Sequence, residues 1–143
     1  MNSKNKSYII IILILFCAQY NNTFAQVSVI ANKSISAKSI DINKLTNLYN
    51  IQSNEIGSQK VKLFYVNNNS ESEKKILESI GKTFIELKKV WLKAKLTASG
   101  TPPETVSSDE EMIQKVASTP DAVGFVDSKN VKGNIKIIAK IGD

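Results

Sequence analysis

The side chains best suited to bind a small ligand are hydroxyls and amides that lie beside glycine, after a strand or at a predicted helix start. Unpaired N–H groups at a helix start carry partial positive charge and attract anions. Glycine allows a ligand to approach the backbone closely. Open α/β sheets bind ligands where their strands end. The candidate ligand-binding residues on these grounds are Ser34, Asn69, Ser70, Ser72, Gly100 and Thr101.

The same patterns also have a purely structural interpretation. Ser70 and Glu73 have the spacing of a capping box, in which the helix itself uses the serine hydroxyl. Glu71 and Glu73 place carboxylates in the first turn, where they stabilise the helix and repel an incoming anion. The Asn67–Asn69 stretch suits a turn as well as a ligand. Residues 100–103, Gly-Thr-Pro-Pro, equally suit a rigid connector.

The composition excludes several kinds of catalytic and metal site. The chain has no histidine, its one cysteine is Cys17, and all of its basic residues are lysine. The usual general base, zinc ligands and the bidentate guanidinium are therefore absent beyond residue 17. The acids Asp109, Glu110 and Glu111 lie in the first turn of a predicted helix, where they complement the helix dipole. We predict that the protein is not an enzyme and uses no metal or other cofactor.

The N-terminus has the three parts of a secretory signal peptide. Lys4 and Lys6 supply positive charge, Tyr8–Ala18 is largely apolar, and Thr23–Ala25 forms a small-residue cleavage site. The apolar run is too short to cross a bilayer core of about 30 Å. We predict that residues 1–25 are a signal peptide, that the protein is periplasmic or otherwise exported, and that only the signal peptide contacts the membrane.

The remaining segment, residues 26–143, is long enough to form one domain. It has 143 − 25 = 118 residues and a net charge of +6 − 2 = +4, because Lys4 and Lys6 leave with the signal peptide. Cys17 also leaves, and Phe16 before it is not the small residue expected at a lipid-attachment site. The lysines are scattered and lack interleaved aromatic residues, so we expect no binding to nucleic acid.

Strand and helix patterns alternate along this segment. Four runs with apolar or alternating composition predict strands, and four runs with capping residues and helical spacing predict helices. The expected strands span residues 27–31, 61–66, 122–126 and 135–141, and the expected helices span 41–49, 70–80, 83–94 and 108–119. Residues 50–60 and 98–103 are expected to be loops. This alternation predicts an α/β fold with a mixed, mostly parallel sheet flanked by helices.

The order of these features resembles the phosphate-type periplasmic substrate-binding proteins of ABC transporters, the type 2 periplasmic-binding-protein class. The resemblance rests on Trp91, the Gly100–Pro103 loop and residues 119–125, Thr-Pro-Asp-Ala-Val-Gly-Phe, which are similar to the family's Pro-Gly-Ala-Ile-Gly-Tyr segment. It implies a single lobe of this fold that binds a small oxyanion such as phosphate. It also implies an envelope transporter or another surface protein as partner.

The sequence departs from the family at the anion site. The serine- and glycine-rich loop near the N-terminus is missing, and so is the arginine that precedes the family's Ser-Gly-Thr. The matching stretch is Asn67–Glu71, which keeps Ser70 but has Glu71 at the glycine position. The alternative function is therefore a non-catalytic accessory module of an envelope assembly that has lost the phosphate site.

Overall fold

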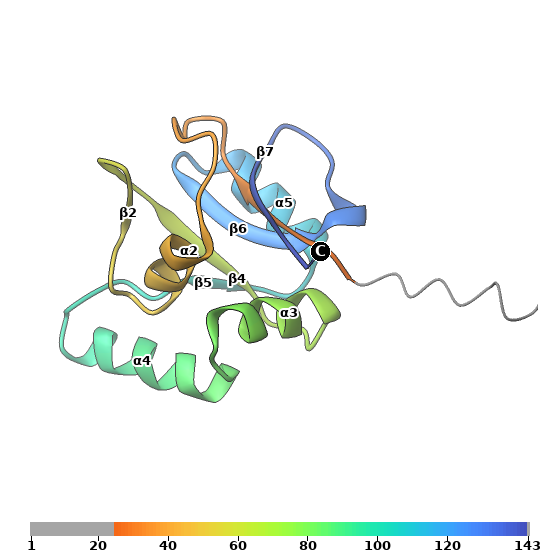
Figure 1. The fold of residues 1–143 in the computed structure, drawn as a ribbon. Coiled ribbons are helices and arrows are strands. Elements are labelled where there is room, and N and C mark those ends of the chain that lie inside the picture. Colours follow the sequence, from red (N-terminus) through yellow and green to blue (C-terminus); the bar gives the residue numbers. More distant parts are fainter. Residues whose placement is uncertain (1–24, 143) are drawn as a thin grey trace, which may run out of the picture.

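The computed structural model describes residues 25–142 (Figure 1). The predicted signal peptide falls almost wholly on residues 1–24, which lie outside the described residues. Among residues 25–142, no helix combines the length and the apolar character that crossing a bilayer requires.

The centre of the fold is a five-stranded sheet with the order β5-β4-β6-β1-β7. Strands β4 (Lys62–Val66), β5 (Glu104–Val106) and β6 (Ala122–Asp127) run parallel to one another. Strand β1 (Val27–Ala31) is antiparallel to both of its neighbours, β6 and β7 (Lys136–Ile141). Four strands thus point one way and β1 points the other. The expected mixed, mostly parallel sheet is confirmed.

Helices cover both faces of this sheet. The helices are α2 (Ile42–Tyr49), α3 (Glu71–Ile80), α4 (Phe84–Leu96) and α5 (Asp109–Ser118). On β6, the Phe125 ring meets the Tyr49 ring of α2 at 5.9 Å, whereas a side chain at the neighbouring Gly124 would clash with Met112 of α5. Because adjacent strand residues face opposite sides, α2 and α5 lie on opposite faces.

Four short elements were not expected from the sequence. The predicted polar loop 50–60 contains a short hairpin of β2 (Glu55–Ile56) and β3 (Gln59–Lys60). The short strand β5 follows the double proline and pairs with the end of β4. A 3-10 turn, η1 (Ser128–Asn130), follows β6. The eight predicted strands and helices all form, with ends that differ by a few residues.

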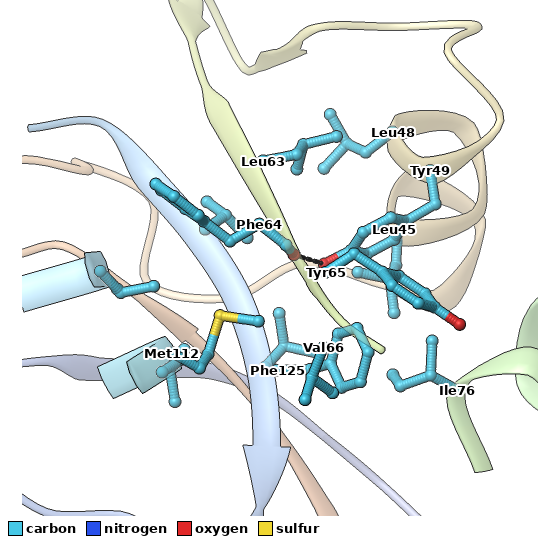
Figure 2. Packing of buried hydrophobic residues seen from close by; sticks show 14 of the residues in the cluster. Leu45, Leu48, Tyr49, Leu63, Phe64, Tyr65, Val66, Ile76, Met112 and Phe125 are labelled. Carbon is cyan, nitrogen blue, oxygen red and sulfur yellow. Dashed lines mark hydrogen bonds between the residues drawn. The ribbon is translucent and has the colours of Figure 1, made fainter. Parts of the chain in front are cut away.

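Several aromatic rings of the core pack around Tyr65, most of them edge to face. The Tyr65 ring lies 5.2 Å from that of Trp91 and 5.4 Å from that of Phe125, measured between centroids. The buried Tyr49 hydroxyl donates to the Phe64 carbonyl at 2.8 Å (Figure 2), and burial raises the pKa of Tyr49. Trp91 is buried in this core. Among residues 25–142, the buried apolar residues all lie between positions 27 and 138.

Candidate functional site

Two helices begin side by side at one edge of the sheet. Parallel strands end at the same edge, and α3 follows β4 while α5 follows β5. An open hollow of about 710 Å³ lies there, which we call the helix-start hollow. Its lining includes the starts of both helices and the segment after β6. The lining residues are Asn68, Ser70, Glu71, Ser72, Ser108, Asp109, Glu110, Ile113, Asp127, Lys129, Asn130, Val131 and Lys132.

The α3 wall is organised by hydrogen bonds that sequence reasoning predicted only in part. The Ser70 hydroxyl accepts a hydrogen bond from the Glu73 N–H at 3.3 Å and lies 2.9 Å from the Ser72 hydroxyl. The other half of the predicted capping box is wrong, since the Glu73 carboxylate does not bond to the N–H of Ser70. Instead, the Glu73 carboxylate lies beside the turn before α3 and accepts hydrogen bonds from the N–H groups of Asn68 at 3.0 Å and Asn69 at 2.6 Å.

The Glu73 carboxylate is held away from the hollow. It also accepts a hydrogen bond from the Tyr65 hydroxyl at 2.8 Å, and the residue is 4% exposed. Burial and this hydrogen bond to Glu73 raise the pKa of Tyr65. The predicted obstruction of the helix start by two carboxylates is therefore reduced to one, Glu71, which forms an ion pair with Lys74 at 2.9 Å.

The α5 wall contains an acceptor without a partner. One carboxylate oxygen of Asp109, Oδ2, accepts from the Asp127 N–H at 3.0 Å and from the Asn130 side-chain amide at 2.8 Å. The other oxygen, Oδ1, is buried and has no hydrogen-bond partner among the described residues. Such an oxygen is unusual, because buried polar atoms are almost always paired.

The charges around the hollow are mixed. Glu71, Asp109, Glu110 and Asp127 contribute carboxylates, while Lys129 and Lys132 contribute ammonium groups. The Lys129 ammonium lies 3.7 Å from Asp127 and its side chain is 77% exposed, so it is free to reorient. The first-turn N–H groups of both helices have no intrahelical acceptor and point toward the helix start. The hollow thus offers both hydrogen-bond donors and acceptors to a small polar ligand.

The residues predicted from the sequence lie in three separate places. Ser70 and Ser72 line the helix-start hollow, and Asn69 adjoins it with its N–H bonded to Glu73. Gly100 and Thr101 line a second hollow of about 590 Å³. We call this second hollow, bounded by α2, the start of β4 and residues 99–104, the connector hollow.

Ser34 lies at a third place, and the direction of β1 explains why. The Ser34 hydroxyl donates to the Asp121 carboxylate at 3.0 Å, just before β6. Because β1 is antiparallel to β6, the end of β1 lies at the opposite edge of the sheet from the ends of β4 and β6. The structure therefore does not bring Ser34 together with Ser70 and Ser72. Ligand binding by any of the six residues stays a prediction.

Sequence reasoning missed the second wall of the helix-start hollow. Its members are Ser108, Asp109 and the residues after β6 that include Asn130 and Lys132. The signal was present in the serine-capped start of α5, where Ser108 accepts from the Glu111 N–H at 3.1 Å. Strand β5, which brings this start beside α3, is too short to recognise from its sequence. No group of three or more acidic, histidine or cysteine residues within 25–142 has the geometry of a metal site.

Comparison with solved structures finds this fold in substrate-binding proteins of phosphate transport. An ABC-type phosphate transport receptor from Vibrio cholerae matches with a TM-score of 0.60 at 20% identity, over 80% of this chain and 46% of that chain. PstS from Borrelia burgdorferi matches with a TM-score of 0.58 at 19% identity, over 81% and 48%. A Clostridium perfringens protein assigned to the phosphate ABC transporter substrate-binding class, solved with bound phosphate, has a TM-score of 0.64 at 12% identity, over 80% and 45%.

These comparisons establish the fold. The chain spans less than half the length of each of these solved proteins. No family model matches the sequence, and no curated protein matches it either. The predicted resemblance is confirmed at the level of structure: the chain shares its fold with a little less than half of each of these phosphate-transport substrate-binding proteins.

Proposed function

We propose that residues 26–143 form an exported solute-binding domain that holds a small oxyanion such as phosphate in the helix-start hollow, after residues 1–25 are removed as a signal peptide. The observation that carries the proposal is the convergence of two helix starts on one open hollow. The fold also supports the proposal, because solved proteins with this architecture serve phosphate transport. An envelope transporter is the partner that this analogy suggests.

The donors for an oxyanion come from both helices and from lysine. Helix starts concentrate N–H groups and partial positive charge, and α3 and α5 both direct their starts to the hollow. Since Glu73 is turned under α3, the first-turn N–H groups of Glu71 and Ser72 remain free of its carboxylate. The ammonium groups of Lys129 and Lys132 supply the positive charge that an arginine supplies in the family.

The unpaired oxygen of Asp109 favours an oxyanion that still carries a proton. A carboxylate oxygen can only accept hydrogen bonds, so it repels a fully ionised ligand and attracts a ligand O–H. At neutral pH inorganic phosphate retains a proton, whereas sulfate does not. The Asp109 Oδ1 atom therefore predicts preference for phosphate over sulfate.

Titration calorimetry of residues 26–143 with phosphate and with sulfate tests the proposal. We expect one-to-one binding of phosphate that weakens when salt is added. Ser72→Ala should weaken it, and Thr101→Ala in the connector hollow is the matched control that should leave it unchanged. Asp109→Asn replaces the unpaired acceptor by a donor and should remove the preference for phosphate over sulfate.

Two results would contradict this proposal. Absence of binding heat with both anions would mean that the fold has lost its anion site, and the accessory-module function would then be preferred. Loss of binding in Thr101→Ala but not in Ser72→Ala would move the ligand to the connector hollow.

A further inference from the structure

Helix α4 has an exposed apolar stripe on the side that faces solvent. Ile85, Leu92 and Leu96 are 66%, 58% and 77% exposed. Their spacing of seven and four residues places them within a sector of about 40° on a helix with 3.6 residues per turn. The stripe runs along roughly 16 Å of the helix, at 1.5 Å per residue. The three side chains are therefore aligned along one side of the helix.

The opposite side of α4 attaches the helix to the domain. Leu87, Trp91 and Ala94 are buried, and the Trp91 indole N–H donates to the Tyr49 carbonyl at 2.8 Å. The N-terminus of α4 is fixed by a full capping box between Thr83 and Glu86. Because these contacts use only the inner side, the stripe on the outer side has no partner within residues 25–142. Figure 1 shows α4 at the periphery of the domain, farther from β7 than α2 and α3 are.

Lysines border the stripe on both sides. Lys88 and Lys95 fall on one side of it, and Lys89 and Lys93 fall on the other, by the same helical geometry. All four are exposed, and none of their ammonium groups forms an ion pair within the described part of the chain. The only acid in α4 is Glu86, whose carboxylate accepts from the Thr83 N–H and hydroxyl. The outer side of α4 is therefore apolar along its middle and positive along both margins.

We propose that this outer side of α4 docks the domain onto a bilayer surface that contains anionic phospholipid. Aliphatic side chains in the middle and lysines at the margins are the composition of helices that lie in a membrane interface. The apolar side chains would enter the acyl boundary, while the lysine stems extend beside them and the ammonium groups reach the phosphates. Membrane contact would then not be limited to the predicted signal peptide.

The composition favours lipid over a protein partner. Protein interfaces are enriched in tyrosine, tryptophan and arginine and depleted in lysine. The outer side of α4 has the reverse composition, since Trp91 and Phe84 belong to the ring cluster and the chain has no arginine. A second copy of the same face is unsuitable, because the lysine margins would repel each other.

Vesicle co-sedimentation of residues 26–143 tests this proposal; this segment contains the buried apolar residues of the described part of the chain and lacks the apolar N-terminus. The vesicles contain phosphatidylcholine alone, or phosphatidylcholine and phosphatidylglycerol in equal parts. We expect binding to the mixed vesicles only, reversed by high salt. The double variants Leu92→Gln with Leu96→Gln, and Lys89→Gln with Lys93→Gln, should each bind roughly tenfold more weakly.

The matched control is Lys38→Gln with Lys60→Gln, which removes the same charge from exposed positions outside α4 and should bind like the parent. Unchanged Trp91 emission in all variants would show that the inner packing of α4 is intact. Equal loss in the control and the Lys89/Lys93 variant would overturn the proposal, because binding would then follow net charge alone. Absence of vesicle binding would overturn it too. If the parent instead bound an acidic protein through α4 and ignored the vesicles, the surface would belong to a protein partner.

Discussion

Helices α3 and α5 begin with the same Ser-x-x-Glu pattern at the same edge of the sheet, yet their glutamates do different things. In both, the serine hydroxyl accepts from the glutamate N–H, for Ser70 at 3.3 Å and for Ser108 at 3.1 Å. Glu73 is buried and bonded to Tyr65 and the preceding turn. Glu111 instead accepts from the N–H and the hydroxyl of Ser107 near the surface.

The preceding strand explains this difference. Strand β4 lies inside the sheet and places the Tyr65 hydroxyl beneath the start of α3, where it needs an acceptor. Strand β5 is a short edge strand and places no such group beneath α5. A sequence pattern therefore specifies that a helix begins, whereas the surrounding strands decide whether its glutamate becomes part of the core. At the start of α5, the acceptor that stays unpaired belongs to Asp109.

The largest difference between the two helix starts is expected when each glutamate is replaced in turn by alanine. Glu73→Ala leaves the Tyr65 hydroxyl and two turn N–H groups without an acceptor and should cost about 3 kcal/mol of unfolding free energy. Glu111→Ala should cost clearly less, because water can replace its bonds near the surface. Urea unfolding of both variants measures the two costs. Equal costs would contradict a structural role for Glu73.

Removal of the Tyr65 hydroxyl tests its hydrogen bond to Glu73 alone. Tyr65→Phe keeps the ring packing but removes one donor to the Glu73 carboxylate and should cost about 1–2 kcal/mol. The matched control is Tyr49→Phe, whose hydroxyl donates to the neutral carbonyl of Phe64. Hydrogen bonds to a charged group are the stronger ones, so Tyr65→Phe should be the more costly change in thermal or urea unfolding. The reverse order would mean that Glu73 is not the important partner of Tyr65.

The smallest expected effect is a dependence on pH at the start of α5. Hydrogen bonds from the Ser107 N–H and then from its hydroxyl hold the pKa of Glu111 below its usual range. A lowered folded-state pKa stabilises the protein fully above the ordinary glutamate pKa, and this stabilisation is lost as the pH falls through the lowered value.

The unfolding free energies of the parent and of Glu111→Gln should therefore converge as the pH falls from neutrality to below about 4. The control is Glu110→Gln, since the Glu110 carboxylate has no hydrogen-bond or ion-pair partner among residues 25–142. A difference between the parent and Glu111→Gln that stays constant with pH would contradict the assigned cause.

Much of the local structure could be predicted from single residues. Asp41 caps α2 by accepting from the Lys44 N–H at 2.7 Å, and Gly81 ends α3 in the left-handed conformation with φ of 66°. The inward side of α4 with Trp91 was recognisable from its helical spacing. These features depend on neighbours within a few positions of the chain, so the sequence expresses them directly. The type of fold followed from the alternation of strands and helices.

The candidate site was determined by tertiary structure. Ser34, Ser70 and Gly100 all follow or adjoin predicted elements in similar ways, and nothing in the sequence states that β1 runs against β6 or that the starts of α3 and α5 adjoin. Strand direction and order arise from which apolar faces bury one another across long stretches of chain. By itself, the sequence specified where elements begin and end, because capping and periodicity are local. Only long-range pairing decided which polar groups share a hollow, and that Glu73 is buried while an oxygen of Asp109 remains unpaired.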